Sequence, residues 1–443
     1  MSADSSPQIL PPPIGRDFFR LAAANVISNL MVPLAGLIDT AFLGHLVEIR
    51  HLAGVALATV IFNVVYWSFG FLRMGTTGMT AQARGRADGD AVRLIALRNG
   101  IIALGLGLLI LLLQVPIREI GFGLLSADST VKASGYDFFN ARIWDAPAVL
   151  LNLVLLGWFL GREQAQRVIL LSLIGNGANI VLDYVFIRQW GWASRGAGVG
   201  TALSQYLLLV VGLLLVVSEG NWRGWRAIVP RLGEVHALKG LFLLNRDILI
   251  RTFALVISFA MFTQFSSALG TQILAANTLL LQVVTLSAYF IDGIAFATES
   301  FAGRFYGSCD RTQLKTLLKL GGLTSLGLGL AFALAFALFP LPLFTLLTSH
   351  SDVLAEVNRF VWWLVPCLGM GAIAFMLDGY FLGLTAGKTL RNSTVLAASV
   401  GFLPLALIAQ AVHSPQMLWL AFTCFMTVRA VTLSVAVPKT LKG

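Results

Sequence analysis

The feature that most constrains this chain is a recurring run of about 20 apolar residues, the length of helix that crosses the hydrocarbon core of a bilayer. Only 12% of the 443 residues are charged and 57% are hydrophobic, whereas soluble domains carry about 25% charged residues. The sequence therefore predicts a polytopic, all-α membrane protein. We predict twelve transmembrane helices, at approximately 17–44, 52–76, 94–115, 135–161, 167–189, 196–217, 242–268, 273–299, 313–340, 355–384, 391–411 and 415–437.

Lysine and arginine are distributed unequally over the loops between these helices. When loops are assigned alternately to the two sides, one side receives 20 such residues and the other six. An excess of Lys and Arg marks the cytoplasmic face. We therefore expect a multi-pass protein of the cell inner (plasma) membrane with both termini in the cytoplasm. The net charge of +10 is a topology signal, and no nucleic acid partner is expected.

The two halves of the chain are related by a repeat. GWFLG at 157–161, in the fourth span, matches GYFLG at 379–383, in the tenth, 222 positions later, and Gly85 matches Gly307 at the same offset. Each half holds six spans, so the copies keep one orientation, as in transporters built from parallel repeats. The expected domains are a disordered cytoplasmic tail (1–16), an N-terminal six-helix lobe (17–217), a cytoplasmic linker on the membrane surface (218–240), a C-terminal six-helix lobe (241–438) and a C-terminal tail (439–443).

The first predicted helix carries polar residues on one face. A charged side chain at mid-membrane costs about 2.5 to 3.5 kcal/mol, so carboxylates there are functional candidates. At 3.6 residues per turn, Asn25, Asn29, Gly36 and Asp39 lie on or near a common face. Pro33 removes a backbone hydrogen bond within this helix, so we expect that the helix can bend.

The fifth predicted helix has a similar polar face. Asn176, Asn179 and Asp183 are spaced i, i+3 and i+7, which places them on one side. With a rise of 1.5 Å per residue, Asp39 and Asp183 lie roughly 7 Å inside the external boundary, and Thr201, on the sixth helix, roughly 9 Å. These residues can share one pocket.

Two carboxylates in one pocket of low dielectric constant cannot both ionise cheaply, so such a pair can bind and release a proton. Asn152, on the fourth helix, lies near mid-membrane. An alternative stays open, in which each aspartate only accepts hydrogen bonds from neighbouring helices.

The second half carries its own intramembrane carboxylates. Asp292 and Glu299 are seven residues apart on the eighth span, and Asp378 lies on the tenth. They could line a cavity for a cationic substrate, hold a second ion, or simply pair with neighbouring hydroxyls and amides. Arg73 is a candidate counter-ion or a side chain that reaches the interface. The residues expected around a central substrate cavity are Asn29, Pro33, Arg73, Asp292, Glu299 and Asp378.

The remaining motifs predict neither catalysis nor a structural metal. The three cysteines lack C-x-x-C spacing and the five histidines form no i, i+4 pair, so a metal framework is not expected. No Ser/His/Asp or Cys/His arrangement is evident, and we expect neither an enzyme nor a cofactor. Small residues in RGAGVGTALS, 195–204, are typical of close helix packing in membranes. Asp247 and Arg251, four residues apart, are interpreted as a helix-surface ion pair.

Several segments resemble the multidrug and toxic compound extrusion (MATE) family. They are VPLAGLIDTAFLGHL in the first span, LRMGTTGMTAQARG in the second, LLNLVLLGWFLGR in the fourth, GNGANIVLDYVF in the fifth and GAGVGTALS in the sixth. LNRDILIRT (244–252) and LDGYFLG in the tenth span resemble the DinF (DNA-damage-inducible protein F) branch. The resemblance extends from about Asp17 to Pro438.

The resemblance implies two pseudo-symmetric six-helix bundles that export drugs, toxic organic compounds or metabolites in exchange for protons or sodium. Family members hold the coupling ion in the N-terminal lobe, at positions that match Asp39, Asn152, Asn179, Asp183 and Thr201, with Asn176 on the same face. The only cofactor implied is H⁺ or Na⁺, with Na⁺ an option at Asp39 and Asp183. A C-lobe sodium site of another branch needs carboxylates on the seventh and tenth helices, and here Asp378 stands alone.

The resulting hypothesis is a monomeric secondary antiporter for small organic substrates in the lipid bilayer, which works by alternating access. Asp39 would carry the proton, with Asn179 and Asp183 as its partners. The main alternative is a flippase of lipid-linked precursors from the wider superfamily, which requires a large and strongly cationic cavity. A second alternative, a membrane-embedded lipid transferase, needs acids, bases or metal ligands in the loops, which contain mostly arginine, glycine and short hydrophobic residues.

Overall fold

The computed structural model describes residues 14–220 and 222–442, and all regular structure in these ranges is helical. In chain order the elements are α1 (Ile14–Gly44), α2 (Arg50–Ser68), α3 (Phe71–Gly85), α4 (Gly89–Leu112), α5 (Gln114–Leu124), α6 (Ser129–Arg142), η1 (Ile143–Asp145), α7 (Ala146–Gly161), α8 (Ala165–Asp183), η2 (Tyr184–Gln189), α9 (Ala193–Val217), α10 (Trp222–Ile228), η3 (Val229–Arg231), α11 (Val235–Ala268), α12 (Thr271–Gly307), α13 (Arg311–Leu338), α14 (Pro340–Phe344), α15 (Ser351–Phe360), η4 (Val361–Trp363), α16 (Leu364–Gly383), α17 (Gly387–Leu396), η5 (Ala397–Phe402), α18 (Leu403–Ala411) and α19 (Pro415–Leu441).

Twelve helical segments within the described ranges are long and apolar enough to cross a membrane, as predicted. The first begins at Ile14 rather than at residue 17. Phe18 and Leu21 near its start are buried, and Phe18 packs against Phe301 of α12. The expected tail therefore ends three residues earlier than predicted, and its residues 1–13 lie outside the described part of the chain.

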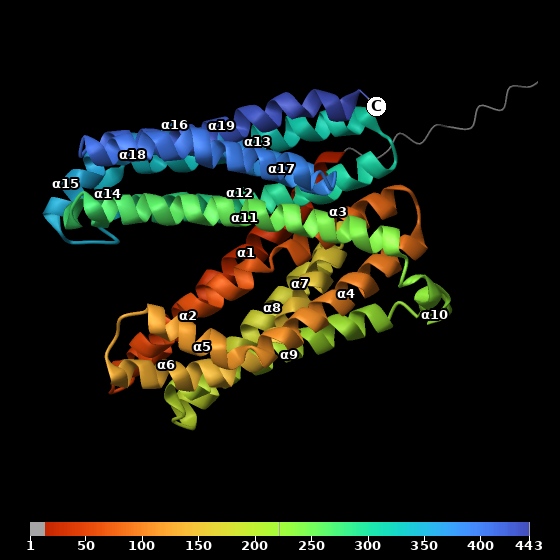
Figure 1. The fold of residues 1–443 in the computed structure, drawn as a ribbon, viewed down its shortest axis with the longest axis horizontal. Helices are drawn as coiled ribbons and strands as arrows, with labels where there is room; N and C mark the ends of the chain where they lie inside the picture. The colour runs from red at the N-terminus through yellow and green to blue at the C-terminus, as the bar shows by residue number, and fades with distance from the viewer. Residues whose placement is uncertain (1–13, 221, 443) are drawn as a thin grey trace, which may run out of the picture.

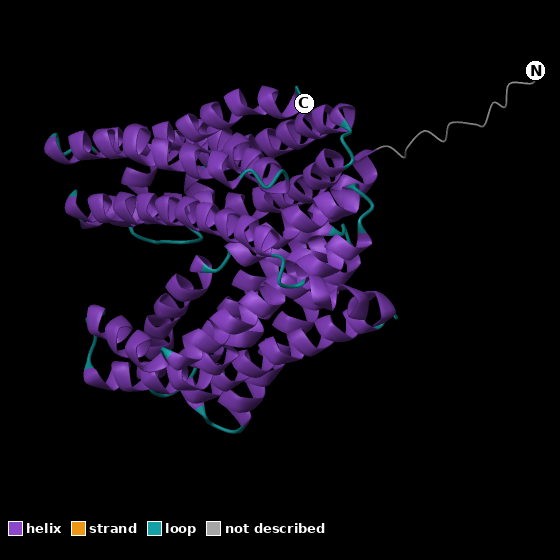
Figure 2. Cartoon of the chain, turned by 45° about the vertical axis from the view of Figure 1, so that its right-hand side comes forward, coloured by secondary structure: helices purple, strands orange, loops and turns teal. Residues whose placement is uncertain are grey.

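The helices form two lobes, α1–α9 and α11–α19 (Figure 1). The lobes converge at the end that carries α10 and the C-terminus, and they diverge toward the end that carries α5, α6, α14 and α15 (Figures 1 and 2). One apolar core cluster continues from the N-terminal lobe into α12 and α16, and a second fills the rest of the C-terminal lobe. The fold class predicted from the sequence is thus confirmed.

The repeat is visible in how the helices pack. Gly157 lets α7 lie directly against the carbonyl oxygen of Arg73 on α3, and Gly379 lets α16 lie against that of Ala295 on α12. Gly379 and Ala295 lie 222 positions after Gly157 and Arg73, respectively. A Cβ atom at either glycine would overlap the backbone, so the GWFLG and GYFLG motifs are sites of close helix approach.

The repeat extends to the helix caps. The side chain of Asp88 accepts a hydrogen bond from the backbone N–H of Ala91 at 2.9 Å at the start of α4, and Asp310 accepts one from Gln313 at 3.0 Å at the start of α13. Aspartate is a favoured residue at this position because its carboxylate satisfies a free N–H of the first turn.

Between the lobes, α3 and α12 cross at the converging end. Gly85 faces the carbonyl oxygen of Arg304, and its repeat partner Gly307 faces that of Gln82. The two symmetry-related helices thus contact each other through matching glycines, which holds the lobes together at this end.

The linker between the lobes contacts the N-terminal lobe. Arg98 of α4 donates through Nε to the carbonyl oxygen of Leu232 at 3.2 Å and through Nη2 to Glu234 Oε2 at 2.9 Å. Ile228 at the end of α10 is 1% exposed. These contacts fix α10 and η3 against α4.

Candidate functional site

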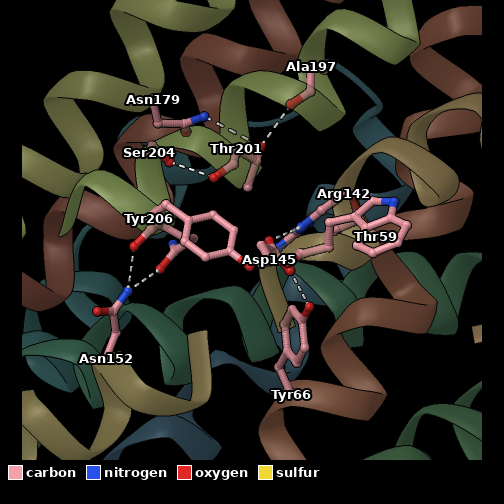
Figure 3. A network of polar contacts seen from close by, with 12 residues as sticks. Thr59, Tyr66, Arg142, Asp145, Asn152, Asn179, Ala197, Thr201, Ser204 and Tyr206 are labelled. Atoms are coloured by element: carbon pink, nitrogen blue, oxygen red, sulfur yellow. Dashed lines mark hydrogen bonds and ion pairs between the residues drawn. The ribbon is translucent and has the colours of Figure 1, made fainter. Parts of the chain in front are cut away.

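The structure brings Asp39 of α1 and Asp183 of α8 together. Their carboxyl groups lie within hydrogen-bonding reach of each other. Asn179 Nδ2 donates to Asp183 Oδ2 at 3.0 Å and lies 3.4 Å from Thr201 Oγ1 of α9. Figure 3 shows Asn179 and Thr201 directed toward each other. Four residues predicted to share a pocket therefore adjoin, although they come from three helices.

Two oxygen atoms of this pair have no hydrogen-bond donor. Asp39 Oδ1 and Asp183 Oδ1 are both buried, and neither receives a hydrogen bond from a described residue. Asp183 is fully buried, whereas Asp39 is partly exposed. Two facing carboxylates without a donor between them repel each other in a medium of low dielectric constant, so a shared proton or a bound cation would stabilise them.

Gly200 of α9 makes room for the buried carboxylate. A Cβ atom at this position would overlap Asp183 Oδ1. The residues that follow Asp183 form the π-helical turn η2, a local widening that is frequent at functional sites. The glycines of RGAGVGTALS therefore serve close packing, as expected, and one of them shapes the candidate site.

A second buried network adjoins the pair and was missed in the sequence. Arg142 contacts Asp145 at 3.4 Å, and Tyr66 donates a hydrogen bond to Asp145 (Figure 3). Arg142 is also the basic residue whose charge acts on both Asp39 and Asp183. The sequence does contain a signal for this network: Arg142 and Asp145 are charged residues three positions apart, just before a proline, within an apolar span.

Two other predicted residues are held by different partners. Asn152 Nδ2 donates to the carbonyl oxygen of Gln205 at 2.9 Å and to its side-chain Oε1 at 3.0 Å, and Figure 3 shows it apart from Asn179 and Thr201. Asn176 Nδ2 donates to the carbonyl oxygen of Ser172 in its own helix at 2.8 Å. No described hydrogen bond joins either residue to Asp39 or Asp183.

Helix α1 belongs to both lobes. At its middle, Asn29 Nδ2 donates to the carbonyl oxygen of Tyr289 in α12 at 3.3 Å, and the hydroxyl groups of Ser28 and Ser172 of α8 are hydrogen-bonded to each other. Near its end, Asp39 contacts α8 of the N-terminal lobe. Pro33 lies between Asn29 and Asp39, and α1 continues through it as one helix. The residue predicted to allow bending therefore lies between the part of α1 that contacts both lobes and the carboxylate of Asp39.

In the C-terminal lobe, Asp378 is neutralised by two arginines. Asp378 Oδ2 accepts hydrogen bonds from Arg251 of α11 and from Arg429 of α19, and Arg429 is fully buried. The interpretation of Arg251 as a surface partner of Asp247 is wrong, because Asp247 is paired with Arg391 at 2.7 Å and Arg251 faces the lobe interior. Arg429 was missed, although it is a single charge within an otherwise apolar span.

The other two candidate carboxylates lie nearby. Glu299 of α12 is fully buried, 3.5 Å from Arg73 Nη1 of α3, and the same guanidinium lies 3.9 Å from the ring centre of Phe296. Asp292 is half-buried, and the charges of Arg73, Arg251, Asp378 and Arg429 act on it. We call the following residues the C-lobe charge cluster: Arg73, Arg251, Asp292, Glu299, Asp378 and Arg429. Three acids face three bases, so the cluster is formally neutral.

A further ion pair joins the lobes at their converging end, in the loop after α7. Glu163 Oε2 lies 2.7 Å from Arg304 Nη1 of α12 and 3.2 Å from Arg84 Nη1 of α3. Burial raises the pKa of Glu163 above its usual value, and the two guanidinium charges only partly oppose this rise. Within the described ranges, no group of three or more His, Cys, Asp or Glu side chains is arranged to hold a metal ion.

Comparison with known proteins identifies a family and a fold. The MatE family profile matches residues 25–185 and 248–408, which begin 223 positions apart. DNA damage-inducible protein F of Escherichia coli (strain K12) is 34% identical over 416 residues, which cover 94% of this chain and 90% of the relative. A probable multidrug resistance protein NorM of Thermotoga maritima is 23% identical over 381 residues, 85% of this chain and 80% of that protein. A solved structure described as the outward-facing conformation of a multidrug resistance MATE family transporter of the MOP superfamily has the same fold, with a TM-score of 0.86 at 20% identity over 97% of each chain.

Proposed function

The chain belongs to the MatE family of membrane transport proteins, and we propose that it is an antiporter that exports small organic compounds in exchange for protons. Asp39 and Asp183 are the proposed coupling pair, with Asn179 and Thr201 as their polar neighbours. The protein lies in the inner membrane as a monomer, with its converging end and both termini at the cytoplasmic face, where the excess of Lys and Arg belongs.

The observation that carries this proposal is the pair of buried carboxylate oxygens without a donor, Asp39 Oδ1 and Asp183 Oδ1. One proton between the two carboxyl groups would turn a repulsive contact into a hydrogen bond. Asp39 is partly exposed, and we propose that the proton reaches it from water on that side. A site that gains stability from one proton and remains accessible to solvent meets the requirements of a coupling site.

The coupling step follows from the position of α1. Protonation would let α1 move toward α8 around Pro33, and the space between the lobes would shrink so that the substrate leaves. Deprotonation toward the cytoplasm would restore the starting state. The driving force is sufficient, since moving one charge across a membrane potential of 100 mV is worth about 2.3 kcal/mol.

The charge balance of the C-terminal lobe argues against the flippase alternative. A transporter for anionic lipid-linked precursors would require an excess of positive charge in its central cavity. In the C-lobe charge cluster, Arg251 and Arg429 are paired with Asp378, and Arg73 lies beside Glu299. The same pairing argues against a second sodium site, because two guanidinium groups already take the place of a cation at Asp378. It therefore favours protons as the coupling ion.

The proposal is tested by efflux of a fluorescent organic cation from proteoliposomes, with either a pH gradient or a sodium gradient imposed. We expect efflux with the pH gradient and its loss in Asp39→Asn and in Asp183→Asn. Asp137→Asn, an exposed aspartate of the same lobe, serves as the matched control and should transport normally. Efflux driven by sodium alone would assign the pair to Na⁺, and normal pH-driven efflux by Asp39→Asn would sink the coupling assignment.

A further inference from the structure

A large apolar cavity lies on the side of the N-terminal lobe, away from the coupling pair. Its volume is about 620 Å³, within the range of roughly 300 to 1,000 Å³ typical of small-molecule sites. α7 forms its floor, α4 and α9 form its walls, and α10 lies at one end. Ile101 and Leu213 on the two walls are 58% and 48% exposed, so the cavity opens on the surface that faces the bilayer.

The cavity extends over about one leaflet. It is lined along α4 from Ala96 to Leu104 and along α9 from Leu209 to Val217. Eight residues of helix rise about 12 Å, which is close to half of the roughly 30 Å hydrocarbon core. The apolar part of the cavity therefore matches the depth that a lipid acyl chain occupies.

One unpaired positive charge lies at the end formed by the linker. Arg226 of α10 lines the cavity, is exposed, and has no ion-pair partner among the described side chains. The neighbouring arginines are already paired, Arg162 with Glu219 at 2.7 Å and Arg93 with Asp90 at 2.8 Å. Arg226 is thus the guanidinium available to an anionic group at the mouth of the cavity.

This end of the cavity is fixed by the fold. Trp225 of α10 lies beside Trp158 of α7, with ring centres 6.1 Å apart, and Trp158 Nε1 donates to the carbonyl oxygen of Val92 at 2.9 Å. Arg98 holds the chain just after α10 through the carbonyl oxygen of Leu232. The linker is therefore positioned to place Arg226 over the apolar cavity.

From these observations we propose that the cavity binds an anionic phospholipid, with one acyl chain between α4 and α9 and the phosphate at Arg226. The apolar lining of the cavity matches an acyl chain, and the basic residue at the headgroup level matches the phosphate. The end that carries Arg226 is also the end with the excess of Lys and Arg, which marks the cytoplasmic leaflet, and the lipids of that leaflet are anionic. The bound lipid connects the linker to the N-terminal lobe.

The first test asks whether a lipid chain occupies the cavity. Purified protein in detergent is titrated with phosphatidylglycerol, and bound lipid is counted by native mass spectrometry. Gly100→Leu fills the cavity, because a Cβ there meets only Leu151, at 4.0 Å, and it should remove at least one tightly bound lipid. Gly105→Leu, on the same helix with open space around it and outside the cavity, is the matched control. Equal lipid binding by both variants would overturn the proposal.

The second test asks whether the headgroup is recognised. We expect phosphatidylglycerol to bind about fivefold more tightly than phosphatidylcholine, the preference that one basic residue confers near an anionic lipid surface. Arg226→Gln should abolish this preference, whereas Lys239→Gln, which removes an equal charge outside the cavity, should preserve it. Equal binding of the two lipids by the unmodified protein, or loss of the preference in both variants, would contradict an anionic lipid site.

Discussion

At the residue scale, the proposed coupling site depends on the room that one glycine provides. Asp183 is held by Asn179 on its own helix and lies against Gly200 of α9, where a Cβ atom would overlap Asp183 Oδ1. Interiors are too closely packed to absorb even one added methyl group without displacement. The position of the carboxylate, and with it the contact to Asp39, therefore depends on a residue that has no polar side chain.

Replacing Gly200 by alanine should impair coupling, because the added methyl group displaces the Asp183 carboxylate from Asp39. We expect pH-driven efflux to fall at least tenfold, with thermal stability lowered by about 1 to 3 kcal/mol, the usual cost of overpacking. Gly177→Ala, in open space on α8, should leave both quantities close to normal. Efflux and unfolding in detergent are measured together, and unchanged efflux by Gly200→Ala would show that Asp183 is not constrained there.

Asp378 is the residue on which the charge balance of the C-terminal lobe depends. Asp378→Asn leaves the guanidinium groups of Arg251 and Arg429 buried without their carboxylate, and breaking a buried pair in this way costs about 3 to 5 kcal/mol. We expect a marked drop in unfolding temperature. The double variant Asp378→Asn with Arg251→Gln should recover part of the loss, because it removes one charge of each sign. Equal unfolding temperatures for the single variant and the unmodified protein would contradict the pairing.

At the element scale, α1 is a helix that contacts both lobes. Asn29 binds α12 and Asp39 binds α8, with Pro33 between them. A proline in a helix interior removes one backbone hydrogen bond and allows a kink. The helix can therefore change direction between its two contacts without breaking either of them.

Pro33→Ala restores the missing hydrogen bond and should stiffen α1. We expect slower pH-driven efflux, severalfold in rate, with thermal stability unchanged or raised. Pro438→Ala provides the control, because Pro438 also lies inside a helix, α19, but near its end. Rates are measured in proteoliposomes at matched protein density. A normal rate for Pro33→Ala would mean that bending of α1 does not limit transport.

At the scale of the whole molecule, the lobes converge at one end and diverge at the other (Figure 2). Glu163 belongs to the converging end and is paired there with Arg304 of the opposite lobe. The proposed alternating access requires this end to open, which would expose Glu163 to water. Because burial raises the pKa of Glu163 above its usual value of 4.5, the converged state binds a proton more readily than an opened state.

The sign of the pH effect follows from linkage. Lowering the pH from neutral toward the usual glutamate value should favour the converged state, and raising the pH should favour opening of this end. Glu163→Gln should remove this dependence and hold the converged state at every pH, whereas Glu48→Gln at the diverging end should preserve it. Distances between spin labels at Arg86→Cys and Lys315→Cys, in a background without the three native cysteines, report the opening. The opposite sign would exclude Glu163 from the gate.

The sequence by itself determined the number of spans, the repeat and the residue types of the proposed coupling site. A run of about 20 apolar residues specifies a membrane helix locally. The offset of 222 follows from comparing the two halves of the sequence directly, at GWFLG and GYFLG and at Gly85 and Gly307. The helical spacing of Asn179 and Asp183 likewise depends only on the geometry of one helix. These inferences required no knowledge of which helices are neighbours.

Only the tertiary structure decided which charges meet. Asp39 contacts Asp183 across 144 positions, and Arg251 and Arg429 both reach Asp378. The sequence spacing predicted instead that Arg251 pairs with Asp247. A separation of four residues on one helix can be read from the sequence, whereas a contact between two helices cannot. In a membrane protein the lipid-facing and interior sides of a helix are both apolar, so periodicity does not reveal how a helix is rotated. Partner choice is then set by the packing of the whole bundle.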